Sequence, residues 1–218
     1  MLKINIQLFT SAGPTAVERL GQLGSSIFLD LKFHDIPNTV KGAVASAVAL
    51  PGVHLLDLHA LGGLEMMRAA AQARDEARSA QLPVPKLLAI TVLTSMDNAA
   101  LRGAGIVGPA SKRAVQLAKL AKKAGMDGVV ASPQEVRAIR RACGKEFLIV
   151  VPGIRRAANA AVTGGGKRKA DDQARVATPE EAIRAGADYL VIGRPITAAP
   201  DPEAAASAII QEIASALT

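Results

Sequence analysis

Asp30-Leu31-Lys32-Phe33-His34-Asp35-Ile36-Pro37-Asn38-Thr39 is the stretch of sequence that decides the fold and the chemistry of this chain. It ends an apolar segment, residues 27–33, which is predicted to be a buried strand. Because side chains alternate between the two faces of a strand, Asp30 and Lys32 are expected to point the same way. A buried pair of opposite charges costs desolvation energy and adds little stability, so a chemical role explains it better. Asp35 adds a carboxylate just past the strand, Pro37 marks a turn, and Asn38 is expected to cap a helix that begins near Thr39.

Short apolar runs alternate with helical patterns along the rest of the chain. The expected strands are 3–9, 27–33, 55–61, 86–93, 128–132, 148–152 and 189–193. The expected helices are 14–23, 39–49, 63–80, 110–124, 133–142, 179–185 and 202–217. Thr178 and Asp201 precede prolines as helix caps, and Gly125 and Gly186 stand where helices should end. Strict β-α alternation over 218 residues predicts one α/β domain, residues 1–218, with a (β/α)8 TIM-barrel fold.

The composition restricts the class of protein. Half of the residues are apolar, only 2% are aromatic, and the formal net charge is +7. We find no apolar run long enough to cross a bilayer and no signal-peptide pattern. The single cysteine, Cys143, agrees with a reducing, cytoplasmic location. The positive charge fits three interpretations, namely solvated helix faces, an enzyme for anionic substrates, or a nucleic-acid binder. The scarcity of aromatic side chains argues against a protein that binds nucleic acid by stacking on its bases.

The decapeptide resembles the signature of the orotidine 5'-phosphate decarboxylase family. The pattern Asp-x-Lys-x-x-Asp is shared with a wider superfamily, whereas the longer string through Thr39 is more specific. Further matches follow in order along nearly the whole chain. They are Lys3, Thr91 to Ser95, Asp127 to Val130, Pro152 to Arg155, Asp172-Gln173 and Gly193 to Thr197.

The resemblance implies a decarboxylase that converts orotidine 5'-monophosphate to UMP without a metal or cofactor. Lys3, Asp30, Lys32 and Asp35 would form its charged array, with Lys32 as the proton donor to C6 of the pyrimidine. Neighbouring carboxylates would keep Lys32 protonated. In this family Asp35 and Thr39 reach into the partner subunit's site, which implies a homodimer with shared active sites.

A second set of residues is expected to bind the substrate itself. Gly193 and Arg194 follow the last predicted strand, at the rim where barrels bind phosphate, and an arginine offers two parallel donors. By resemblance, Arg155, Gln173, Gly193 and Arg194 bind the phosphate, with Gln173 on a long polar loop that closes over it. The same resemblance puts Thr94 and Ser95 beside the pyrimidine and includes Pro152 among the substrate-binding residues.

Three histidines and one basic loop receive no catalytic role. His34 is expected to support the turn of the decapeptide, His59 to end a strand near the rim, and His54 to lie in a loop. None has partners at metal-ligand spacing. The glycines and basic residues at 164–169 are expected to form a solvated loop tip.

Only seven strands can be counted, and the first resembles the second strand of the family's barrel. We therefore expect a further strand and helix before residue 1, carrying an aspartate that contacts the substrate ribose.

Three alternatives stay open at this point. One is another Asp-x-Lys-x-x-Asp enzyme, a magnesium-dependent sugar-phosphate decarboxylase or aldolase. Another is a basic nucleic-acid-binding protein, whose binding would be salt-sensitive. The last is a chain of the decarboxylase family that is inactive because its first strand is missing.

Overall fold

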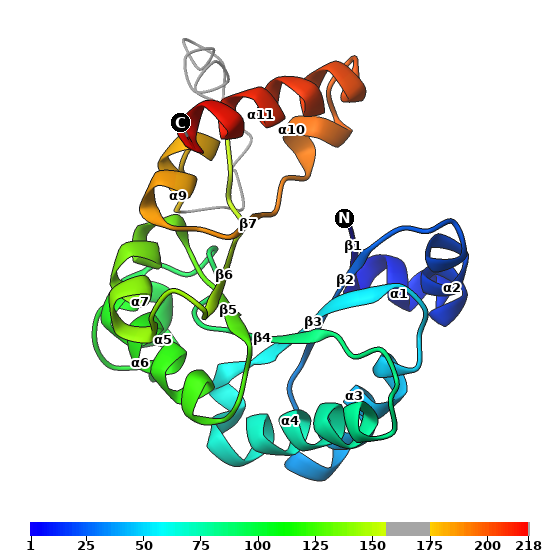
Figure 1. Ribbon diagram of the computed structural model, residues 1–218. Helices are drawn as coiled ribbons and strands as arrows, with labels where there is room; N and C mark the ends of the chain where they lie inside the picture. The colour runs from blue at the N-terminus through cyan, green and yellow to red at the C-terminus, as the bar shows by residue number, and fades with distance from the viewer. Residues whose placement is uncertain (156–174, 218) are drawn as a thin grey trace. The chain divides into compact units, whose positions relative to one another are not determined.

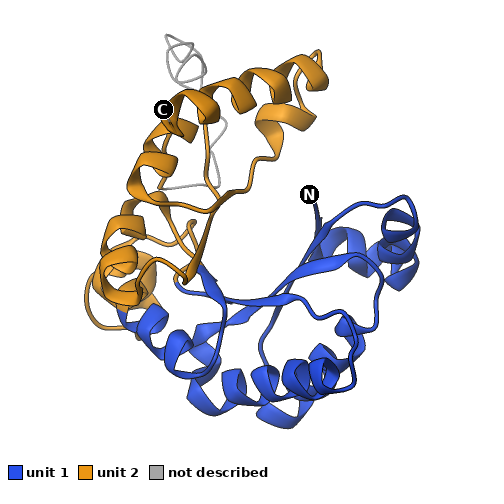
Figure 2. Ribbon diagram, in the orientation of Figure 1, with its two compact units in different colours: residues 1–91, 116–129 blue, residues 92–115, 130–218 orange. Residues whose placement is uncertain are grey.

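The computed structural model describes residues 1–155 and 175–217, which form two compact units (Figure 2). The first unit contains Met1–Thr91 and Gln116–Val129, and the second contains Val92–Val115 and Val130–Thr218. Strands and helices alternate through both units, as the colour gradient of Figure 1 shows.

The first unit is built on four parallel strands that pair in chain order. They are β1 (Leu2–Asn5), β2 (Ile27–Phe33), β3 (Val53–His59) and β4 (Lys86–Ile90). The helices of this unit are α1 (Ile6–Ala12), α2 (Pro14–Gln22), α3 (Pro37–Val48) and α4 (Gly63–Ser79), with a short 3-10 turn, η1 (Ala60–Gly62). Leu29, Leu56 and Leu87 are fully buried on neighbouring strands, as expected for a parallel sheet whose faces are covered.

The second unit contains two paired parallel strands, β6 (Leu148–Val151) and β7 (Tyr189–Leu190). β5 (Gly128–Val130) crosses the boundary between the units, and so does α6 (Ala110–Lys123). The other elements of this unit are α5 (Asn98–Gly103), η2 (Pro133–Glu135), α7 (Val136–Cys143), α9 (Pro179–Ala185), α10 (Arg194–Thr197) and α11 (Pro202–Leu217).

The predicted ends of α9 and the predicted start of α11 are confirmed. Thr178 and Glu181 form a reciprocal capping box at the start of α9. The Asp201 carboxylate accepts the amide of Ala204 at 2.9 Å at the start of α11. Gly186 ends α9 with a φ of 105°, a conformation that side-chain-bearing residues rarely adopt.

Arginine–aspartate pairs, one nearly buried and one partly exposed, fix the starts of two strands in the same way. In the first unit, Asp127 accepts the Leu87 amide at 2.8 Å and an Arg74 guanidinium N–H at 2.6 Å. In the second unit, Asp188 accepts the Ile149 amide at 2.7 Å and an Arg140 N–H at 2.6 Å. Each carboxylate therefore ties a helix to the beginning of a neighbouring strand.

Several sequence expectations are wrong in detail. Residues 6–9 form α1 rather than strand, because the Asn5 side chain accepts the Leu8 amide and caps a helix there. Asn38 is not a cap, since α3 already begins at Pro37, without a side-chain cap. The predicted strands 86–93 and 189–193 end earlier, at Ile90 and Leu190, and the short helices α5 and α10 were not predicted. The basic tip at 164–169 and Gln173 lie outside the described residues.

Candidate active site

The carboxyl end of β2 brings three charged side chains together in the first unit. The ammonium of Lys3, on β1, lies 2.6 Å from one oxygen of Asp30. The ammonium of Lys32 contacts the other oxygen of Asp30. The Asp30 side chain is 9% exposed, whereas the two lysine side chains are about one third exposed, at 29% and 34%. A nearly buried carboxylate thus holds two cations whose ammonium groups reach toward solvent.

The backbone of β2 is irregular at Lys32. Lys32 has a φ of 54°, in the left-handed region, and the β2–β3 register shifts between Leu29 and Phe33. For a residue with a side chain this conformation costs roughly 1–2 kcal/mol. The Lys32 amide donates to the Asp57 carboxylate, on β3, at 2.8 Å. The amide of this strained residue therefore has a side-chain acceptor on the neighbouring strand.

Asp57 is a second carboxylate of the cluster, and the sequence analysis missed it. It is 1% exposed and hydrogen-bonds the Asp30 side chain. Burial, followed by the negative charge of Asp30, raises the pKa of Asp57 well above its usual range. Burial also raises the pKa of Asp30, but hydrogen bonds from Asp57, Lys3 and Lys32 outweigh it, so the pKa of Asp30 is lowered. Of the two carboxyl groups, Asp57 therefore holds a proton more readily than Asp30.

Two histidine rings border the cluster. The ring centroids of His34 and His59 lie 5.2 Å apart. Burial, then the charges of His34 and Lys32, lower the pKa of His59 to about 4, so its ring is neutral at physiological pH. The Nδ1 atom of His59 is buried without a hydrogen-bond partner among the described residues. His59 ends β3, as predicted.

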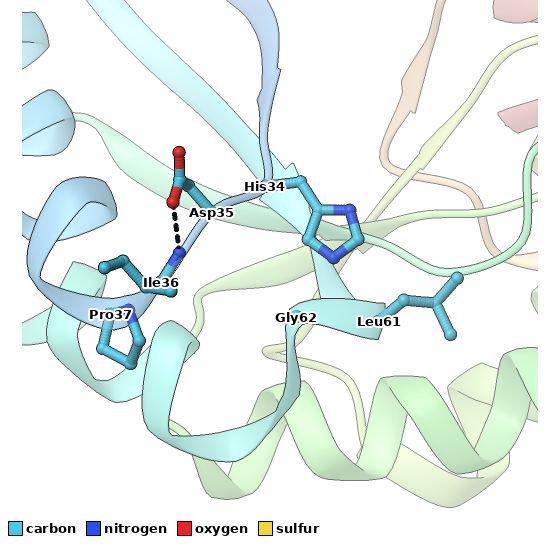
Figure 3. A pocket seen from close by; sticks show the side chains of 6 residues that line it. All are labelled: His34, Asp35, Ile36, Pro37, Leu61 and Gly62. Atoms are coloured by element: carbon cyan, nitrogen blue, oxygen red, sulfur yellow. Dashed lines mark hydrogen bonds between the residues drawn. The ribbon is translucent and has the colours of Figure 1, made fainter.

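Asp35 lies apart from the cluster, on the exposed turn before α3. Its carboxylate accepts the Ile36 amide at 2.6 Å, and it forms no ion pair with any residue of 1–155 or 175–217. Asp35 borders an open hollow of about 530 Å³, lined by His34, Asp35, Ile36, Pro37, Leu61 and Gly62. Figure 3 shows the Asp35 carboxylate turned toward the start of α3, while the His34 ring points away from it. Thr39, also exposed, lies in the first turn of α3.

The arginines predicted to bind phosphate follow neighbouring strands of the second unit. Arg155 comes after β6 and Arg194 after β7, and these two strands are paired in parallel. The Arg155 amide donates to the Ala177 carbonyl at 2.9 Å. Gly193 precedes α10, and a Cβ atom added to it would meet no described atom within 4 Å. The two arginines therefore emerge at the carboxyl edge of one pair of strands, beside a glycine with open space above it.

The remaining predicted substrate residues also belong to the second unit. Thr94 is buried and Ser95 is exposed, both shortly after β4, and Pro152 is half-buried after β6. Among the described residues, no group of three or more His, Cys, Asp or Glu side chains is arranged to hold a metal ion. No described helix is both long and apolar enough to cross a membrane.

Comparison with known proteins identifies the family. The model of the "Orotidine 5'-phosphate decarboxylase / HUMPS family" matches residues 1–209. The chain belongs to this family. An orotidine 5'-phosphate decarboxylase of Geobacter sp. (strain M21) is 55% identical over 213 residues, covering 98% of this chain and 85% of that protein. The orotidine 5'-phosphate decarboxylase of Moorella thermoacetica is 54% identical over 215 residues, covering 98% of this chain and 81% of that protein.

Two solved structures share the fold. The crystal structure of orotidine 5'-phosphate decarboxylase from Lactobacillus acidophilus matches with a TM-score of 0.81 and 40% identity, over 97% of this chain and 85% of that one. An uncharacterized conserved protein from Geobacillus kaustophilus matches with a TM-score of 0.80 and 35% identity, over 97% of this chain and 88% of that one. The predicted fold class, α/β of the TIM-barrel type, is confirmed.

Proposed function

We infer that this chain is a carbon–carbon lyase that decarboxylates orotidine 5'-monophosphate to UMP in pyrimidine biosynthesis. The observation that carries the inference is the Lys3–Asp30–Lys32 cluster in a chain that matches the decarboxylase family over residues 1–209. A nearly buried carboxylate between two ammonium groups contributes little to folding. It suits a reaction that develops negative charge on carbon.

The reaction requires a cation and a proton at one carbon atom. When the bond between C6 and its carboxylate breaks, carbon dioxide leaves and the electron pair stays on C6. No ring position delocalises that pair well, so a fixed positive charge must stabilise it. We assign this role to Lys32, whose ammonium then donates a proton to C6 and is reprotonated from solvent.

Asp30 and Lys3 prepare Lys32 for this step. Asp30 keeps the Lys32 ammonium in place through direct contact, and Lys3 neutralises the second oxygen of Asp30. The cluster is therefore preorganised before the substrate arrives, which is where most electrostatic catalysis originates. Repulsion between Asp30 and the departing carboxylate is a smaller contribution in this proposal.

The phosphate and the pyrimidine are assigned to residues of the second unit. Arg155, Gly193 and Arg194 would bind the phosphate, supported by their position after neighbouring parallel strands and by the open space at Gly193. Gln173, outside the described residues, would join them. Thr94, Ser95 and Pro152 would contact the pyrimidine.

We further propose a homodimer whose active sites combine residues of both chains. Asp35 and Thr39 would be contributed to the partner's site, and Asp35 would there complete the charged array. The exposed turn supports this assignment, because the apolar side chains of Ile36 and Leu61 beside it are 67% and 45% exposed. The proposal includes a cytoplasmic location, which suits the single cysteine, and attributes the positive charge to an anionic substrate rather than to nucleic acid.

The experiment is conversion of orotidine 5'-monophosphate to UMP by the purified chain, followed by chromatography, with and without a strong chelator. We expect UMP to form at the same rate in both. Turnover that stops with the chelator and returns with magnesium would contradict a reaction without a metal. The alternative, a magnesium-dependent sugar-phosphate decarboxylase or aldolase, predicts no UMP under either condition. Absence of UMP from a folded chain would contradict the proposed function.

A further inference from the structure

Asp57 is the one buried carboxyl group of the cluster to which the proposed mechanism gives no task. It lies inside β3, two residues before His59, and is 1% exposed. Its Oδ1 atom accepts the Lys32 amide at 2.8 Å, and its carboxyl group hydrogen-bonds Asp30. In the described part of the chain, no ammonium or guanidinium group pairs with it directly, since both ammonium groups of the cluster contact Asp30.

The charged and titratable groups around Asp57 come from three strands. Lys3 lies on β1, Asp30 and Lys32 lie on β2, and His59 ends β3. Lys3 and Lys32 both form their ion pairs with Asp30. An ionised Asp57 would therefore be a second buried negative charge beside Asp30. A protonated carboxyl avoids that repulsion, and burial and the charge of Asp30 both raise the pKa of Asp57 accordingly. Such a group accepts the Lys32 amide with one oxygen and donates to Asp30 with the other.

The backbone conformation of Lys32 depends on its hydrogen bond to Asp57 in this proposal. At φ 54° the Lys32 side chain leaves the strand in a direction that a regular β2 would not allow, and the register with β3 shifts around it. The only side-chain acceptor that the described residues offer to the Lys32 amide is Asp57. Loss of that acceptor would free the backbone to return to regular strand geometry and would turn the ammonium away from its present place.

We propose that Asp57 is a positioning residue, a neutral carboxyl group that holds the Lys32 backbone in its left-handed conformation and stabilises the Asp30 carboxylate between the two lysines. The proposal rests on the proposed function, because it assigns Asp57 to the same site. It acts through Lys32 and Asp30 and makes no contact with substrate.

Two substitutions of Asp57 distinguish a residue that positions Lys32 from a residue that only stabilises the fold. Asp57→Asn keeps one acceptor and one donor on the same skeleton and should retain kcat within a few-fold. Asp57→Leu keeps the volume but removes both hydrogen bonds, and kcat should fall on the order of 100-fold, because misplacing a catalytic group by about 1 Å can cost that much. KM should change little in either variant, because Asp57 does not contact the substrate.

Leu56→Ala is the matched control for damage to β3. Leu56 is fully buried on the same strand and belongs to the core. Its substitution should lower the melting temperature but leave kcat per folded molecule unchanged. A folded Asp57→Leu variant with wild-type kcat, or an Asp57→Asn variant as impaired as Asp57→Leu, would overturn the proposal.

Infrared spectroscopy tests whether the Asp57 carboxyl group is protonated, and it needs neither the substrate nor the Asp57→Leu variant. The infrared spectrum of the folded wild-type chain at neutral pH should contain a protonated-carboxyl C=O band that is missing from Asp57→Asn. Identical spectra would overturn the proposal even if the chain decarboxylates orotidine 5'-monophosphate. If the band is present but the wild-type chain forms no UMP, the proposed function fails while the state of Asp57 stands.

Discussion

Asp30 joins two ammonium groups at the end of β2, and this residue explains most of the chemistry expected of the chain. Strand alternation predicted the contact between Asp30 and Lys32 from their positions in the sequence. In the structure the contact is made although β2 departs from regular strand geometry at Lys32. The left-handed backbone of Lys32 was not predictable in this way, because its acceptor, Asp57, is 25 residues further along the chain. One signal was present, since Asp57 is the only carboxylate within the apolar strand 53–59.

Arg194 offers the simplest test of phosphate binding. Arg194→Ala should weaken binding of UMP by roughly 1.5–3 kcal/mol, the range of hydrogen bonds to charged groups, and leave uridine binding nearly unchanged. Calorimetric affinities of both ligands give the comparison. Arg102→Ala, a substitution on α5 far along the chain from β6 and β7, is the control for removing a cation. Equal losses for UMP and uridine would show that Arg194 does not bind the phosphate.

His59 should make stability depend on pH. The pKa of His59 is about 4 in the folded chain, against 6.5 without perturbation, so the unfolded state binds more protons between these values. The free energy of unfolding should therefore fall as the pH is lowered from about 6.5 toward 4. In His59→Gln, the free energy of unfolding measured with urea should depend less on pH between these two values.

His54 lies on β3, so its predicted position in a loop is wrong, and its side chain is exposed. His54→Gln therefore removes an exposed histidine of the same strand and is the control. It keeps His59 and should retain the wild-type slope on the acid side. A slope that survives in His59→Gln, or vanishes in His54→Gln, would contradict the assignment of the pH dependence to His59.

Helices and strands mostly lie where the sequence places them, because their ends are marked by local chemistry. α9 and α11 match the predicted 179–185 and 202–217, with caps at Thr178 and Asp201. The errors occur where a single side chain changes the outcome. Asn5 converts a hydrophobic run from strand to helix, which the apolar pattern alone cannot indicate.

The nearly buried Arg74–Asp127 pair at the start of β4 should matter for stability rather than for catalysis. Asp127→Ala should cost about 3 kcal/mol of unfolding free energy, because it leaves the nearly buried guanidinium of Arg74 without this partner. Asp75→Ala removes an exposed partner of the same arginine and should cost less than about 1 kcal/mol. Denaturant unfolding of both variants gives the comparison, and equal costs would contradict a special role for Asp127.

At the scale of the whole molecule, the family and its fold are established over nearly the full chain. Strict β-α alternation was sufficient to predict the fold class from sequence. The expectation of a further strand and helix before residue 1 stays a prediction, and so does the dimer. Neither follows from contacts within one chain.

The dimer with shared sites predicts complementation between two inactive variants. Lys32→Ala and Asp35→Ala should each be inactive as homodimers. When the two variants are mixed in equal amounts and exchange subunits freely, half of the dimers contain one chain of each variant. In such a dimer, one of the two sites combines an intact Lys32 with an intact Asp35. Activity should recover to about a quarter of wild type. Failure to recover, with heterodimers proven by mass spectrometry, would show that each site is built from one chain.

The central claim is that Lys32 supplies the charge and the proton for decarboxylation. The most direct test is the rate of UMP formation from orotidine 5'-monophosphate by wild type, Lys32→Ala and the control Lys41→Ala, which removes a lysine paired with Glu76 on the neighbouring helix. Circular dichroism establishes that each chain is folded. We expect wild-type turnover to survive in Lys41→Ala and to be abolished in Lys32→Ala. A folded Lys32→Ala chain with near-native turnover would contradict the claim.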